Sequence, residues 1–383
     1  MYRIVLGAGL FFILIAPETA TTSVTGVCDN CHTMHNSQGG STLAHSSSVG
    51  SPAGWTGGNQ LAGGTSEPQG NLLVSNCVGC HSSSTSATII NLGSGLRIPI
   101  VFNTVEPTTP LAGGNFYYTV TNGDNFGHNV RGISAADAVH LANGNSPGQQ
   151  LGCANSCHVS LALTDDETVP LMDGGHKNGC QGCHQSVRHH GIDPAAGQPV
   201  DEESGWYRYL SAPSGHLGFG NGVYGIEDAD WEQNPTSAAH NTHYGGDNTI
   251  LQEEPQSIGR FCAGCHYQFH SPGNAFDLVD NGGGINPWLR HPANATIPNA
   301  DEYTSYTVYD PMVPVGRPEK DTIASVDPTV VRPGADKVIC LSCHRAHGSP
   351  YPDMLRWDYA NDCRGEVPDP NCGCFTCHST KDE

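Results

Sequence analysis

The first hydrophobic pattern in the chain is an unbroken apolar run from Ile4 to Ala16, which follows the positive charge of Arg3. The run is too short to cross a bilayer and is typical of a secretory signal peptide, which we place over about residues 1–22. No later stretch is apolar enough to span a membrane. We therefore expect residues 23–383 to pass through the periplasm and to be secreted to the extracellular space or the cell surface.

A second pattern predicts short strands. Residues 82–127 contain the stretches ATIINLGSGLRIPIVFNTV and NFYYTVTNG, which are rich in β-branched and aromatic residues. Residues 201–260 and 271–335 are long connectors rich in Gly and Pro, and the chain has no strict repeat of the solenoid kind. We expect mostly irregular coil with short helices and few short strands, organised as one extended domain over residues 23–383.

The composition strengthens the prediction of irregular structure. Of the 383 residues, 48 are Gly and 26 are Pro, and only 7% are aromatic. Gly costs backbone entropy and Pro removes a hydrogen-bond donor, so few long helices or strands can form. Something other than secondary structure must organise such a chain. The formal net charge of −21 argues against nucleic acid as a partner, because binding to phosphates needs clustered Lys and Arg.

The cysteines indicate what organises it. The sequence has 16 Cys, and most stand in pairs followed directly by His, the C-x-x-C-H signature of covalent c-type haem attachment. Two thioether bonds would hold the edge of each macrocycle, the His would reach the iron, and the buried haem would supply the missing core. Without haem we expect an unfolded chain. The seven candidate haem c sites are Cys28, Cys31 and His32; Cys77, Cys80 and His81; Cys153, Cys157 and His158; Cys180, Cys183 and His184; Cys262, Cys265 and His266; Cys340, Cys343 and His344; and Cys374, Cys377 and His378.

The evidence is unequal among these sites. One C-x-x-C-H could arise by chance or form a redox or zinc half-site, but six perfect copies behind a signal peptide indicate haem. The site at Cys153 is weaker, because CANSCH has an extra residue between the thiols, and a disulfide or free thiols are the alternative there. Cys363 and Cys372 are expected to form a disulfide in an oxidising compartment, unless Cys372 replaces Cys374 as a haem anchor.

The histidines outside the motifs are candidate second ligands. Seven irons need seven further ligands, and the chain has 20 − 7 = 13 spare His against five Met. His/His coordination is the economical interpretation, and it closes each iron to substrates and favours electron transfer at low potential. We prefer His190 to its neighbour His189, and His240 to His243. The candidate second ligands are His35, His128, His189, His190, His240, His270, His291 and His347.

Three of these candidates, His35, His270 and His347, follow a motif histidine by three or four residues. If the segment after the motif is helical, the two rings project from one helix face and cannot sit on opposite sides of one iron. The second His must then reach a different haem, so each such segment joins two haems into a close pair. Repetition of this device makes a chain of haems.

Several stretches carry a family resemblance: CHTMHNSQGG, GHNVRG, WLRHPAN and CLSCHRAHGSPYPDMLRW. In them the chain resembles the OmcS-like extracellular multihaem c-type cytochromes, which polymerise into nanowires in metal-reducing bacteria. The resemblance is best at the N-terminus, around His291 and from Cys340 to Trp357. The middle of the chain is more similar to other multihaem cytochromes of the same bacteria, and the motif CANSCH departs from the OmcS pattern.

The resemblance implies bis-His haems in one continuous chain. It also implies that His35 binds the iron held by Cys340, Cys343 and His344 of the next subunit, so that identical subunits join head to tail in a filament. Electrons would pass to redox partners or extracellular acceptors. Two alternatives remain open, a monomeric periplasmic or outer-surface electron shuttle and a multihaem oxidoreductase. An enzyme would need an open iron position, whereas His is in surplus and there is no C-x-x-C-K motif, so we expect an electron-transfer protein.

Overall fold

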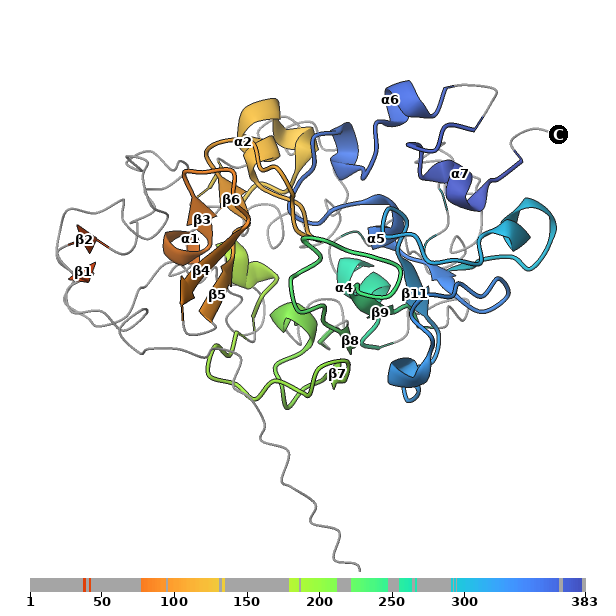
Figure 1. Ribbon diagram of the computed structural model, residues 1–383, viewed down its shortest axis with the longest axis horizontal. Coiled ribbons are helices and arrows are strands. Elements are labelled where there is room, and N and C mark those ends of the chain that lie inside the picture. Colours follow the sequence, from red (N-terminus) through yellow and green to blue (C-terminus); the bar gives the residue numbers. More distant parts are fainter. Residues whose placement is uncertain are drawn as a thin grey trace, which may run out of the picture.

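The computed structural model is largely irregular, with short helices and short strands (Figure 1). No α-helix within the described residues exceeds 6 residues and no strand there exceeds 5. The predicted fold class is therefore confirmed. None of the described helices has the length and apolarity needed to cross a bilayer. The structure describes residues 37–38, 41–42, 77–93, 96–130, 133–134, 179–185, 187–211, 222–246, 255–263, 266, 291, 293, 295–364 and 368–380.

The regular elements are spread along the chain, with α1 and β3–β6 on one side, α7 on the other, and α4 and α5 between them (Figure 1). The described α-helices are α1 (Cys77–Cys80), α2 (Tyr117–Asn122), α4 (Ile258–Ala263), α5 (Cys340–Cys343), α6 (Tyr359–Asp362) and α7 (Cys374–Cys377). The described strands are β1 (Ser37–Gln38), β2 (Ser41–Thr42), β3 (Ser82–Ser83), β4 (Ile89–Gly93), β5 (Leu96–Pro99), β6 (Phe102–Asn103), β7 (Pro199–Val200), β8 (Gly225–Ile226), β9 (Thr242–Tyr244), β10 (Ala295–Thr296), β11 (Val315–Arg317) and β12 (Lys337–Val338).

The first predicted β stretch, ATIINLGSGLRIPIVFNTV, does form strands. β4 and β5 pair antiparallel as a hairpin, and β6 pairs parallel with β3. Val78, Phe102, Phe116, Val130 and Ile133 are buried together beside these strands. The enrichment in β-branched and aromatic residues therefore predicts this part of the fold correctly.

The second predicted β stretch, NFYYTVTNG, is wrong, because its centre forms helix α2. The side chain of Asn115 accepts a hydrogen bond from the N–H of Tyr117, at 3.0 Å, at the start of the helix. Gly123 ends the helix with φ at 120°, a conformation that other residues rarely adopt. These local hydrogen bonds outweigh the β propensity of the tyrosines and valine.

The long connectors were expected to be irregular, yet they supply four strands of a six-stranded sheet, β8 to β11, and β7 and β12 lie just outside them. The strand order is β10-β12-β11-β9-β8-β7. β9 and β11 pair parallel, whereas the other neighbours pair antiparallel. β12 ends at Val338 and α5 begins at Cys340, so the sheet leads directly into one of the cysteine motifs.

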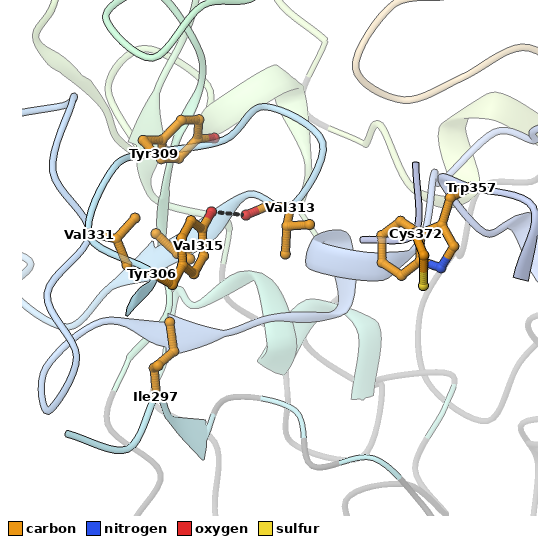
Figure 2. Close-up of a cluster of buried hydrophobic side chains, with 8 residues drawn as sticks. All are labelled: Ile297, Tyr306, Tyr309, Val313, Val315, Val331, Trp357 and Cys372. Carbon is orange, nitrogen blue, oxygen red and sulfur yellow. Dashed lines mark hydrogen bonds between the residues drawn. The ribbon is translucent and has the colours of Figure 1, made fainter. Parts of the chain in front are cut away.

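A hydrophobic cluster packs within the second connector and the C-terminal segment, and we name it the connector core (Figure 2). Its aromatic residues come from irregular segments, not from the sheet. The connector core consists of Ile297, Tyr306, Tyr309, Val313, Val315, Val331, Trp357 and Cys372. Side chains alone therefore form a hydrophobic core here, although haem was expected to supply the core.

A buried ion pair lies beside the connector core. Arg317, with 1% of its side chain exposed, donates to the carboxylate of Asp336 at 2.5 Å. The same carboxylate accepts from Arg332 at 2.7 Å, and Arg317 also donates to the carbonyls of Val330 and Pro328. A buried guanidinium with carboxylate and carbonyl acceptors satisfies the condition under which a charge can stay inside a protein.

Candidate haem sites

The described attachment motifs share one backbone geometry. α1, α5 and α7 each begin at the first cysteine of a motif and end at the second. The Cys180 motif lies in a 3-10 turn, Gly179–Gly182, and Cys262 lies in α4. At each described site the N–H of the motif histidine donates to the carbonyl of the first cysteine at 2.9–3.0 Å, and these histidines are His81, His184, His266, His344 and His378. One turn of chain thus holds the cysteines and the histidine close together.

The motif imidazoles are oriented by hydrogen bonds at Nδ1. Nδ1 of His81 lies 2.8 Å from the carbonyl oxygen of Pro99, and Nδ1 of His184 lies 2.7 Å from that of Arg208. Nδ1 of His344 lies 2.7 Å from the carbonyl oxygen of Asp353. Because a carbonyl can only accept, Nδ1 carries the hydrogen and Nε2 keeps its lone pair. This is the usual arrangement of a histidine that binds a metal through Nε2.

Four motif histidines each have a spare histidine beside them. The ring centroids are 6.2 Å apart for His81 and His189, and 6.1 Å apart for His184 and His347. The other two pairs are His266 with His128, at 6.1 Å, and His378 with His291, at 6.2 Å. Each pair contains one motif histidine and one spare histidine, and no histidine is used twice.

This spacing fits two axial ligands of one haem iron. A bond from a metal to an imidazole nitrogen is about 2 Å, and the ring centre lies about 1 Å further, so two rings on opposite sides of one iron have centroids roughly 6 Å apart. The angle between the two ring planes ranges from 21° to 85° among the pairs. Rotation about the axis through the iron permits any such angle, so the variation is compatible with axial ligation.

Burial favours the neutral form of four of these imidazoles, and the neutral form is the one that binds a metal. Desolvation lowers the pKa of His81, His184 and His189 below the usual histidine value. It lowers the pKa of His347 to about 3, with smaller contributions from His184 and His128. A neutral imidazole can donate a nitrogen lone pair to a metal without first losing a proton.

The segment that follows the Cys340 motif is not helical, so His344 and His347 do not meet the condition of a shared helix face. α5 ends at Cys343, and His344 is extended and forms a β-bridge with Leu355, so these two histidines do not lie on one helix. His347 nevertheless lies beside His184 and not beside His344. In addition, the carbonyl of Ala346 in this segment accepts a hydrogen bond from Nδ1 of His128 at 2.6 Å.

His344 differs from the other described motif histidines. Within the described residues no second histidine ring lies beside it, although its Nδ1 is held by a carbonyl in the same way. The site at Cys340 is therefore complete on one side only, as far as the described part of this chain is concerned.

One preference among the spare histidines differs from the ring contacts, and the preference for His240 over His243 is not decided by them. The ring beside His81 belongs to His189 and not to the preferred His190. His240 is buried and stacks on Tyr309 with centroids 3.5 Å apart, and its buried Nε2 has no hydrogen-bond partner. Its neighbour His243 is also buried, next to Tyr207. Neither has a motif histidine beside it among the described residues.

Two motif cysteines lie where the thiol form is favoured over the thiolate. Burial, with neighbouring thiols, raises the pKa of Cys343 to about 12 and that of Cys377 to about 11. Such thiols are uncharged at neutral pH. Cys363 and Cys372 form a disulfide, as expected, so Cys372 does not replace Cys374 as an anchor.

The described sites follow one another through the molecule. After desolvation, a smaller electrostatic contribution from His184 lowers the pKa of His81, and His184 and His128 contribute in the same way to the lowered pKa of His347, so these rings lie near one another. α4, which carries Cys262, lies beside α5 (Figure 1). Cys343 of α5 packs in the same cluster as the cysteines of α7. The sites at Cys77, Cys180, Cys262, Cys340 and Cys374 thus form a connected series.

Some predicted residues lie outside the described part of the chain. They are Cys28, Cys31, His32, His35, Cys153, Cys157, His158, Cys265 and His270, together with the side chain of Cys80.

One contact was not predicted from the sequence: Nδ1 of His378 lies 2.9 Å from a carboxylate oxygen of Glu302. Glu302 lies far from the motif in an acidic connector, so no sequence signal indicates it.

Comparison with known proteins supports the haem interpretation. The family model described as "Doubled CXXCH motif" matches residues 332–383, which contain the last two motifs. The chain is 24% identical over 396 aligned residues to the C-type cytochrome OmcS of Geobacter sulfurreducens (strain ATCC 51573 / DSM 12127 / PCA). The match covers 92% of this chain and 84% of that protein. The predicted resemblance to OmcS-like c-type cytochromes is therefore confirmed.

Two solved structures are also similar to this chain. "Outer Membrane Cytochrome S Filament from Geobacter Sulfurreducens" is 19% identical, with a TM-score of 0.39 and coverage of 89% of this chain and 86% of that one. "Cryo-EM of the OmcS nanowires from Geobacter sulfurreducens" is 18% identical, with the same TM-score of 0.39 and coverage of 94% and 100%.

Proposed function

We propose that this chain is a heptahaem c-type cytochrome that conducts electrons through a continuous line of bis-His haems. The observation that carries the proposal is the set of ring pairs, each of which joins one motif histidine to one spare histidine at 6.1–6.2 Å. A haem held at each site would supply one-electron redox chemistry, and its two imidazole ligands from the chain would leave no position for a substrate. The protein would therefore transfer electrons and not catalyse a reaction of a bound substrate.

The chain's own residues would bind and orient these groups. Motif cysteines would form the thioether bonds, and motif histidines would ligate one face of each iron. Carbonyl acceptors at Nδ1 fix the ring orientation and reserve Nε2 for the iron. The second ligands would be His189 for the Cys77 site, His347 for the Cys180 site, His128 for the Cys262 site and His291 for the Cys374 site.

The remaining sites would take their second ligands from the remaining candidates. These sites are at Cys28, Cys153 and Cys340, and the candidates are His35, His190, His240 and His270. The unpartnered, buried Nε2 of His240 supports its place in this group, since a neutral imidazole nitrogen without a hydrogen bond is costly to bury.

We also propose that identical subunits join head to tail, with His35 of one subunit binding the iron at the Cys340 site of the next. The support is the resemblance of CHTMH and CLSCH to the OmcS type, together with the missing second histidine beside His344 among the described residues. Such a contact uses different surfaces on the two copies, so it produces an open filament. The filament would be secreted and would deliver electrons to acceptors outside the cell.

Replacing His35 with Ala tests this arrangement. We expect monomers that keep all their haems but form no filaments in electron micrographs, because the ligand that joins subunits is gone. One iron per chain should become high-spin and bind CO, whereas the wild-type filament should be entirely low-spin. His45→Ala is the matched control, because this nearby histidine is not a predicted ligand, and it should polymerise normally. Filaments of normal length in the His35 variant would contradict the inter-subunit ligand.

A further inference from the structure

The imidazole of His378 is held differently from the others. At three other sites Nδ1 of the motif histidine meets a neutral main-chain carbonyl oxygen. At His378 it meets the carboxylate of Glu302, with Nδ1 2.9 Å from Oε1. The acceptor at this site therefore carries a negative charge, which none of those three acceptors does.

Several contacts hold Glu302 in position. It lies in a 3-10 helix, Asp301–Ser305, which packs beside α7. Its carbonyl oxygen accepts from the hydroxyls of Ser305, at 2.7 Å, and Ser379, at 2.8 Å. The ring of Tyr303 packs edge-on against the His378 ring at 5.1 Å. The Glu302 side chain is only 21% exposed, so its contact with the imidazole is part of the packed structure.

A carboxylate that accepts the Nδ1 hydrogen makes the imidazole a stronger electron donor at Nε2. The hydrogen is drawn toward the anion, so the ring gains part of the character of an imidazolate. A more basic ligand and an added negative charge both stabilise the ferric over the ferrous state, and hydrogen bonding around a ligand is one of the ways a protein sets a haem potential.

We propose that Glu302 lowers the reduction potential of the haem at the Cys374 site by hydrogen-bonding to its ligand His378. The inference rests on the proposed function, since it requires a haem ligated by His378. Glu302 acts through the ligand and does not touch the iron, so it is a positioning residue. Because Cys343 and Cys374 pack in one cluster, this residue would set the energy step between the Cys340 and Cys374 sites.

Glu302→Gln tests the proposal, because an amide oxygen can still accept the hydrogen bond but carries no charge. We expect one midpoint potential in the redox titration to rise, and one low-spin signal in the electron paramagnetic resonance spectrum to shift. The other haems should be unchanged. Glu302→Asp keeps the carboxylate on a shorter side chain and should give a smaller rise in the same direction, which also covers the case in which the Gln variant does not fold.

Asp301→Asn is the matched control, because it removes a neighbouring exposed negative charge without a hydrogen bond to His378. If it raised the potential as much as Glu302→Gln does, general charge would explain the effect and the proposal would be overturned. Unchanged potentials and spectra in both Glu302 variants, with normal haem content, would overturn it as well.

A double variant, Cys374→Ala with Cys377→Ala, assigns the signal. It should lack one haem by mass spectrometry, and the signal that it lacks should be the one that shifts in the Glu302 variant. Adding Glu302→Gln to this background should change nothing further. If the double variant kept its full haem content, the proposed haem site itself would be wrong. If it lost one haem while Glu302→Gln shifted a different signal, only the role of Glu302 would be wrong.

Discussion

Around Arg317 the chain surrounds a buried charge with its own hydrogen-bond acceptors, whereas around His347 it holds two imidazole rings apart. Arg317 is surrounded by the Asp336 carboxylate and two carbonyls and is 1% exposed. His347 and His184 are partly exposed rings whose centroids lie 6.1 Å apart, which leaves room for a metal between them. The first region is a core that side chains complete, whereas the second, under the proposed function, would be completed by a haem iron. The two regions should therefore fail in different ways.

Asp336→Ala should have the largest effect on stability in the region around Arg317. It would leave Arg317 as a buried cation without its carboxylate, and the loss of one partner of a buried pair typically costs about 3–5 kcal/mol. We expect this loss in the free energy of local opening, measured by hydrogen exchange at the amides of β11 and β12. The haem spectra should remain those of the wild type as long as the chain stays folded.

Glu319→Gln provides the control for charge alone. Glu319 pairs with Arg332 at 2.8 Å, but both side chains are more than 30% exposed. Exposed ion pairs contribute only about 0.2–1 kcal/mol, so the effect on hydrogen exchange should be small. A loss as large as that of the Asp336 variant would show that burial is not what makes the Arg317 pair important.

His347→Ala should have the opposite result: the haem spectra should change while hydrogen exchange in the sheet stays normal. Removal of the ring leaves a gap beside Phe116, whose ring centroid lies 4.7 Å away, and a cost of about 2–3 kcal/mol is expected because the ring is only partly buried. The distinctive result should be spectroscopic: one iron becomes high-spin and binds CO, while β11 and β12 keep their protection from exchange.

His347→Met separates ligation from packing at the same position. Methionine fills much of the space and can still ligate iron, and His/Met coordination raises the reduction potential. The variant should stay low-spin, with one raised midpoint potential. If two irons bound CO in the His347→Ala variant, or if none did, His347 would not be the second ligand of the one iron ligated by His184.

The same contrast explains how much the sequence could predict. The motif turns follow from neighbouring residues, so the one-turn geometry at α1, α5 and α7 is predictable from C-x-x-C-H itself. The fold of the connectors decides which spare histidine lies beside which motif. The sequence therefore could not predict that His189, and not His190, lies beside His81. Nor was Glu302, since nothing in its local sequence points to His378.

The connectors also show where composition alone misled, although the fold class itself was predicted correctly. Their glycines suggested irregular chain, yet Gly245 and Gly316 permit the close approach of β9 and β11, since a Cβ on Gly316 would lie 2.7 Å from the Cα of Gly245. Strands of two or three residues are too short to leave an alternating pattern. The pairing of such strands depends on contacts between distant segments, which a local pattern does not record.

The smallest effect is expected from Tyr309 in the connector core, and its contrast with Tyr306 makes it informative (Figure 2). The Tyr306 hydroxyl donates to the carbonyl of Val313 at 2.6 Å, whereas the buried Tyr309 hydroxyl has no hydrogen-bond partner. Removing an unsatisfied buried hydroxyl removes its desolvation cost, so Tyr309→Phe should leave the free energy of unfolding unchanged or raise it by up to about 1 kcal/mol. Tyr306→Phe leaves the Val313 carbonyl unpaired and should cost about 1–3 kcal/mol. Denaturant unfolding of the two holoproteins measures both. A clear loss of stability in Tyr309→Phe would mean that its hydroxyl binds a cofactor group, and the connector core would then belong with the haem sites.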